Sequence, residues 1–145
     1  MKRWIKIGAG VLALAFAAIQ FVPVERSNPP VEEEVPAPDD VRGILRRSCY
    51  DCHSNETAWP WYSRVAPLSW LVARDVEEGR EHLNFSTWNR LDQGARAHAL
   101  EEAWEEVDEG EMPLWFYLPL HPSANLSDDD RARLRAWAVG GSPDS

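Results

Sequence analysis

The sequence predicts an all-α protein built on one small domain. Wherever apolar residues recur regularly, they do so at intervals of three and four residues, and no stretch alternates apolar with polar residues as a half-buried strand does. Helix-capping residues and glycines bound these stretches. The length of 145 residues fits one domain, and no internal repeat divides the chain.

The first element is an apolar segment at residues 1–23. Basic residues precede an apolar run that ends at Val22, which is the pattern of an export signal. Counted from Trp4, the run has 19 residues, close to the roughly 20 that span a bilayer. We therefore expect an uncleaved signal anchor, a single-pass transmembrane helix of the inner membrane that leaves the domain in the periplasm. Small-x-small triplets at residues 13–17 leave cleavage open, which would give a periplasmic or secreted domain.

Residues 24–39 are predicted to form an extended linker. Four prolines remove backbone donors, and the acidic run at residues 32–34 repels itself. At about 3.1 Å per residue such a segment reaches roughly 50 Å. It is interpreted as a tether that lets the domain sweep between partners, or as an arm packed on the domain surface.

Residues 40–141 form the predicted domain, followed by a tail at residues 142–145. Asp39 or Asp40 is expected to cap the first helix, and Asn84 or Ser86 a short turn. Ser127 opens the last helix in a capping-box pattern. The expected elements are a helix from about 40 toward 49, a helix over 67–79 ended by Gly79, a short turn through 88–91, a helix over 93–109 stopped by Gly110, and a helix from 128 to the glycines at 140 and 141.

Charge narrows the possible partners of this domain. From Asp40 onward the chain has 11 arginines, no lysine and 19 acidic residues, a balance of about −8. Nucleic-acid binding needs a basic face, so no nucleic-acid partner is expected. The negative net charge allows the domain to dock on a basic patch of a redox protein partner. The alternative is that the charge only keeps the domain soluble. The oligomeric state is not predicted.

The two cysteines, the only ones in the chain, stand with a histidine in the run Cys49-Tyr-Asp-Cys52-His53. C-x-x-C-H is the attachment sequence for c-type haem. Cysteines three residues apart lie on one side of a helical turn, so both reach one edge of a porphyrin, and the adjacent histidine supplies an axial imidazole. The sequence predicts one covalent haem c, with His53 as an iron ligand.

Three other interpretations of these cysteines remain. Zinc would need His53 and one further histidine, because the chain has no second C-x-x-C. A redox dithiol usually follows a strand, and none is predicted before Cys49. A structural disulfide has no need of His53.

Met112 is the predicted sixth ligand of the iron. It lies 59 residues after His53, between a helix stop and Pro113, so it sits on a loop and its thioether can face a metal. Methionine and histidine together are the common ligand pair of electron-transfer haems. His121 is the second candidate, and a gap-filling core methionine is the alternative for Met112.

The chain resembles the bacterial haem-binding domain family of small exported proteins with one C-x-x-C-H. The resemblance runs through Asn28-Pro-Pro30, Cys49-Tyr-Asp-Cys-His-Ser-Asn55, Trp59-Pro-Trp-Tyr-Ser63, Pro67-Leu-Ser-Trp-Leu71, Gly79-Arg80, Asn84-Phe-Ser86, Met112-Pro113 and His121-Pro122. It implies a cytochrome-c-like helical domain wrapped around one haem c.

Further contacts with the haem are expected from the residues after the attachment turn. Trp59, Trp61 and Tyr62 are predicted to wall the ring or to hydrogen-bond a propionate, and Arg64 or Arg80 to pair with a propionate. With both axial positions filled, the predicted function is single-electron transfer, with no catalytic residue. The alternatives are a haem-based gas or redox sensor with a labile sixth ligand, and a peroxidase-like enzyme with an open distal side.

Overall fold

The computed structural model describes residues 1–140 and is all-helical there. Its α-helices are α1 (Lys2–Ile19), α2 (Asp39–Ser48), α3 (Tyr50–His53), α4 (Leu68–His82), α5 (Gln93–Glu109) and α6 (Asp128–Gly140). Three 3₁₀ turns, η1 (Trp61–Arg64), η2 (Trp88–Arg90) and η3 (Pro122–Ala124), join them. In this part of the chain the only β pairing is an isolated bridge between Glu33 and Thr87. The prediction of an all-α fold is confirmed, and the predicted tail at 142–145 lies outside the described residues.

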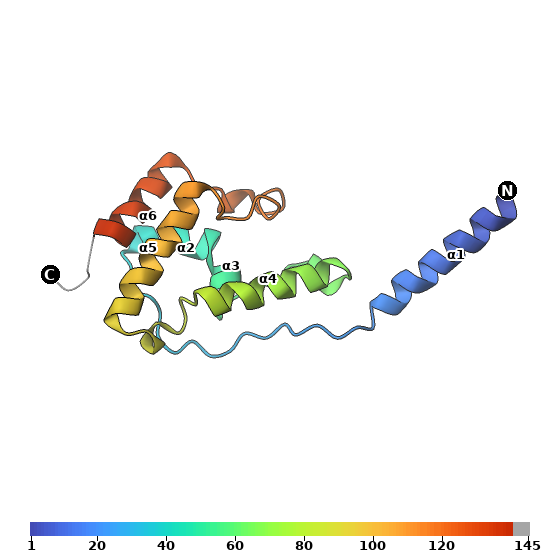
Figure 1. Ribbon diagram of the computed structural model, residues 1–145, viewed down its shortest axis with the longest axis horizontal. Helices are drawn as coiled ribbons and strands as arrows, with labels where there is room; N and C mark the ends of the chain where they lie inside the picture. The colour runs from blue at the N-terminus through green and yellow to red at the C-terminus, as the bar shows by residue number, and fades with distance from the viewer. Residues whose placement is uncertain (141–145) are drawn as a thin grey trace.

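Helices α2, α5 and α6 pack together at one end of the domain, and α4 extends from the other end (Figure 1). Their shared core is built on apolar side chains from distant parts of the chain. Its buried members include Val35, Ile44, Trp88, Leu100 and Leu134. The short helix α3 lies between α2 and α4 and contacts both.

The end of α5 at Gly110 and the start of α6 after Ser127 follow the predicted signals, whereas the cap at the start of α5 was not predicted. Asp92 accepts a hydrogen bond from the Ala95 amide at 2.9 Å, and Gly110 ends α5 with a φ of 82°, a left-handed conformation that favours glycine. Ser127 and Asp130 exchange hydrogen bonds between side chain and amide in both directions, which is a capping box. Local sequence therefore determines both helices.

Helix α4 does not end where the sequence predicted. It continues to His82, three residues past Gly79. A Cβ atom at position 79 would lie only 2.7 Å from the Cys52 carbonyl oxygen, so glycine is required for the close approach of α4 to α3. Similarly, α2 begins at Asp39 without a side-chain cap, with both predicted capping residues inside its first turn.

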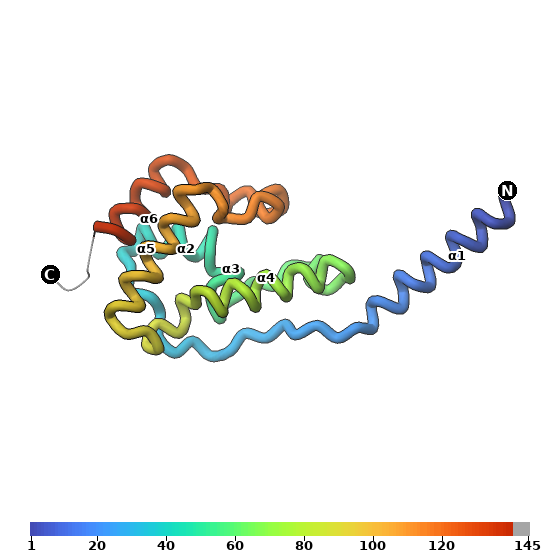
Figure 2. Tube along the Cα trace, in the orientation of Figure 1, coloured from blue at the N-terminus to red at the C-terminus, as the bar shows by residue number. Residues whose placement is uncertain are grey.

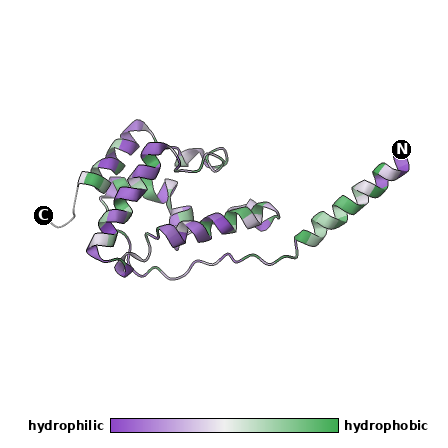
Figure 3. Ribbon diagram, in the orientation of Figure 1, coloured by the Kyte–Doolittle hydropathy of each residue, from purple (hydrophilic) through white to green (hydrophobic). Residues whose placement is uncertain are grey.

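The predicted single-pass membrane anchor is wrong. Of the helices in residues 1–140, none combines the length and apolar character that a bilayer crossing requires. The first turns of α1 carry Lys2, Arg3 and Lys6, and its apolar part, residues 7–19, is about 20 Å long against a hydrocarbon core of about 30 Å. Figure 3 shows the same change from polar to apolar along α1.

Residues 24–37 run extended along the domain (Figure 2). The amides of Glu32 and Val35 donate to the carbonyls of Ser86 and Phe85, each at 2.9 Å, and Val35 is buried in the core. Glu32 also pairs with Arg90. The segment is therefore a packed arm, and the interpretation as a free tether is wrong.

Candidate haem site

The attachment turn is the helix α3 with its flanking residue Cys49. The His53 and Cys52 amides donate to the Cys49 carbonyl at 2.9 and 3.1 Å, which closes one helical turn and places both sulfurs on one side of it. Both cysteines are free thiols. All three of Cys49, Cys52 and His53 keep partial exposure, so a porphyrin brought to this face can reach them.

The structure bears on the other interpretations of these thiols. Although each cysteine is partly exposed, desolvation of the sulfur raises the pKa of Cys49 and of Cys52 to about 12. A redox dithiol instead needs a lowered pKa to hold a reactive thiolate. Within residues 1–140 no cluster of three or more His, Cys, Asp or Glu side chains is arranged to hold a metal ion.

His53 is oriented by the main chain of the turn that follows α4. Its Nδ1 lies 3.0 Å from the Leu83 carbonyl oxygen. A carbonyl only accepts, so Nδ1 carries the proton and Nε2 keeps a free lone pair. Burial lowers the pKa of His53, which keeps the ring neutral. A neutral imidazole with its remote nitrogen bound to a carbonyl is the form that ligates metals.

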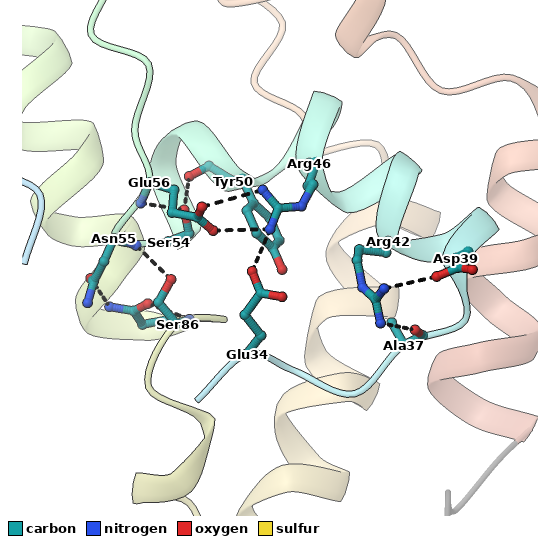
Figure 4. Close-up of polar contacts among 11 residues, drawn as sticks. Glu34, Ala37, Asp39, Arg42, Arg46, Tyr50, Ser54, Asn55, Glu56 and Ser86 are labelled. Carbon is teal, nitrogen blue, oxygen red and sulfur yellow. Dashed lines mark hydrogen bonds and ion pairs between the residues drawn. The ribbon is translucent and has the colours of Figure 1, made fainter. Parts of the chain in front are cut away.

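A buried polar network fixes the residues after His53 (Figure 4). The main-chain amide of Asn55 donates to Ser86 Oγ at 2.9 Å, and the side-chain Nδ2 of Asn84 donates to Asn55 Oδ1 at 2.9 Å. Phe85 donates its amide to the His53 carbonyl at 2.8 Å. Every member of this network has partners, so it holds the histidine rigidly.

Arg46 adds an ionic contact on the outer side of the attachment turn (Figure 4). It pairs with Glu34 of the arm and Glu56 after α3, and its guanidinium lies 5.0 Å from the centre of the Tyr50 ring. The pairs are partly exposed, so each contributes little energy alone. Together they join three segments around Tyr50.

Met112 lies in the loop of residues 111–121, here called the distal loop. The Glu111 and Met112 amides both donate to the Glu106 carbonyl at 3.0 Å, which fixes the start of this loop on the end of α5. Met112 is partly buried and packs on the same core as Cys49 and Leu83. Its role as a ligand stays a prediction.

The three aromatic residues predicted around the ring differ in their contacts and exposure. Trp59 Nε1 donates to Asn28 Oδ1 at 3.2 Å, beside a groove of about 480 Å³ between residues 23–27 and α4. Trp61 is 75% exposed. The Tyr62 hydroxyl lies 3.3 Å from His121 Nε2. The proposed ring contacts of these three residues stay predictions.

Arg80, a predicted propionate partner, and His121, the second candidate for the sixth ligand, make other contacts in the structure. The Arg80 guanidinium donates to the carbonyls of Ser54 and Ser27 and to the side chains of Asn28 and Thr57, at 2.7 to 3.0 Å. These four hydrogen bonds join the arm to the residues after His53. They use the guanidinium donors that would otherwise pair with a haem propionate. His121 has both ring nitrogens within hydrogen-bond distance of tyrosine oxygens.

The sequence reasoning missed apolar side chains of the distal loop. Several exposed apolar residues stand there and at the start of α4: Leu68, Leu71, Trp115, Phe116 and Leu120. The signal was present, because residues 114–120 form an unbroken apolar and aromatic run that contains no predicted helix.

An all-helical domain with two adjacent thiols and an oriented, neutral imidazole has the residues that hold a haem. Residues 14–139 match the family model described as a haem-binding domain. The chain belongs to this haem-binding domain family. Neither the curated proteins nor the solved structures contain a match.

Proposed function

We propose that this protein is a monohaem c-type cytochrome that carries single electrons. Cys49 and Cys52 would bind one haem covalently, with His53 and Met112 as the axial ligands of its iron. The bound haem supplies an iron that alternates between the +2 and +3 states, and a methionine ligand raises its potential. The haem-binding family match supports the cofactor.

The observation that carries the proposal is the bond between His53 Nδ1 and the Leu83 carbonyl. It orients the imidazole and leaves Nε2 as the nitrogen that can bind the iron. Such preorganisation keeps an axial ligand in place through both oxidation states, which suits electron transfer. The attachment of Met112 to the end of α5 favours a carrier over a sensor, because a sensor needs a sixth ligand that leaves.

Redox proteins with a basic face are the partners that this function implies. The acidic balance of the domain, about −8 from residue 40 onward, would steer such a partner at low salt.

Carbon monoxide binding to the reduced, haem-loaded protein tests the function. With Met112 on the iron, the wild-type protein is expected not to bind the gas, while Met112→Ala is expected to bind it readily. Rapid binding by the wild-type protein would show an open sixth position and would overturn the carrier proposal in favour of a sensor.

A further inference from the structure

The distal loop is tied to the attachment turn far from its start on α5. The Tyr117 hydroxyl donates to Asp51 Oδ2 at 2.7 Å, and Asp51 lies between the two cysteines. The other oxygen of Asp51 accepts the Ala58 amide at 2.9 Å, which holds the carboxylate in place. A hydrogen bond to a charged acceptor is stronger than one between neutral groups.

A second bond lies beside the first. The His121 ring stacks on Tyr117 with ring centres 3.8 Å apart and planes 7° apart. His121 Nδ1 lies 3.2 Å from the Tyr117 carbonyl, so Nδ1 donates there and Nε2 is left to accept from the Tyr62 hydroxyl at 3.3 Å. One histidine tautomer satisfies both contacts. Two tyrosine hydroxyls therefore connect the distal loop with the segment around the cysteines.

We propose that these two bonds, Tyr117 to Asp51 and Tyr62 to His121, form a distal latch that positions Met112 as the sixth ligand. The inference rests on the proposed function. Met112 stands at the first attachment of the loop, where its amide donates to the Glu106 carbonyl, and the second attachment, Tyr117, follows five residues later. A loop held at both ends has far fewer conformations than one held at a single end, so the latch lowers the cost of keeping the methionine in place.

The donor of the first bond is the Tyr117 hydroxyl, which an ordinary tyrosine pKa of about 10 already keeps protonated at neutral pH. Burial and the neighbouring Asp51 raise the pKa of Tyr117, so its hydroxyl keeps the proton that it donates. Removing this hydroxyl takes away a bond to a charged group, a loss that corresponds to about tenfold or more in an equilibrium. Tyr117 and Asp51 act through Met112 and are positioning residues.

Imidazole titration of the oxidised, haem-loaded full chain tests the latch, because imidazole competes with Met112 for the iron. Tyr117→Phe keeps the ring that stacks on His121 and is expected to bind imidazole at least about tenfold more tightly than the wild-type protein. Tyr62→Phe is expected to change binding in the same direction. Tyr50→Phe is the matched control, because the Tyr50 hydroxyl is buried without a partner, and it is expected to leave binding unchanged.

A double-variant cycle separates the latch from general loosening. Asp51→Ala removes the acceptor, so if Tyr117 acts through Asp51, adding Tyr117→Phe leaves the imidazole affinity the same as in Asp51→Ala alone. The latch also predicts faster hydrogen exchange at the Leu120 and His121 amides in Tyr117→Phe, a readout that does not depend on the iron.

Two results would overturn the proposal, and they differ from each other. If Tyr117→Phe changes neither the imidazole affinity nor the amide hydrogen exchange of the distal loop, the latch proposal is wrong, while the haem and its ligands are unaffected. If Met112→Ala binds imidazole no more tightly than the wild-type protein, Met112 is not the ligand, and both the ligand assignment and the positioning role fail.

Discussion

Gly79 gives the sharpest test of how α4 supports the haem site. A Cβ atom at this position would lie 2.7 Å from the Cys52 carbonyl oxygen and 3.1 Å from Cys52 Cβ. The closest atoms belong to the backbone and cannot rotate away, so Gly79→Ala forces α4 to move away from α3. Overpacking of this kind costs about 1–3 kcal/mol.

The helical propensity of alanine partly offsets this cost, and a control isolates it. Alanine is favoured over glycine inside a helix by about 1 kcal/mol. Gly43 lies inside α2, and a Cβ atom added there would meet no atom within 4 Å, so Gly43→Ala gains the propensity alone. The two variants should therefore differ in unfolding free energy by about 1–3 kcal/mol, with Gly79→Ala the less stable.

Urea unfolding of the full chain, followed by far-ultraviolet circular dichroism, measures this difference. Gly79→Ala should also disturb His53, because the Gly79 carbonyl accepts from the Leu83 amide at 2.9 Å and Leu83 in turn orients the imidazole. Equal stability of the two variants would refute the argument that glycine is required for the contact between α3 and α4.

Three further predictions concern single side chains. Arg80→Lys should destabilise the protein by about 2 kcal/mol, because one ammonium cannot reach the four acceptors that the guanidinium binds. Urea unfolding measures this loss. An unchanged midpoint would contradict the role of Arg80 in joining the arm to the residues after His53. Hydrogen bonds from Arg47 and Ser127 lower the pKa of Asp130 to about 2, so its stabilisation is present above about pH 4 and is lost as pH falls toward 2. Asp130→Asn should then cost about 1–2 kcal/mol at pH 7 and almost nothing near pH 2, whereas a pH-independent cost would argue against this ion pair. Met112→Ala should abolish the weak sulfur-to-iron absorption at the red end of the oxidised spectrum, and persistence of that band would exclude Met112 as the ligand.

Local signals in the sequence were sufficient for part of the fold. The bounds of α5 follow from Asp92 and Gly110, and the start of α6 follows from Ser127 and Asp130, because each cap is complete within a few residues. Gly79 has the same appearance in the sequence as Gly110. Its task is set by Cys52, 27 residues away, and no local pattern reveals that contact.

Composition misled the interpretation of the N-terminal region. The prolines and glutamates of residues 24–39 are typical of a free linker, but the arm pairs with backbone groups at residues 85–88 and buries Val35. Its partners lie some 50 residues further along the chain, so composition alone could not distinguish a packed arm from a tether. The apolar count in α1 likewise included Lys6, which interrupts the run.

The haem site was predictable where its parts are adjacent in sequence. Cys49, Cys52 and His53 form one helical turn, so their spacing alone fixes their arrangement. The Leu83 carbonyl that orients His53 lies 30 residues away, and Tyr117 lies 66 residues from Asp51. Such contacts depend on how α4 and the distal loop fold back on the attachment turn.

The most direct test is the mass and spectrum of the denatured, acid-extracted protein after expression with a cytochrome c maturation system. We predict a mass equal to the polypeptide plus one haem, and a pyridine haemochrome spectrum of a haem bound through two thioethers. A colourless polypeptide of unmodified mass would contradict covalent haem attachment, and with it the proposed function.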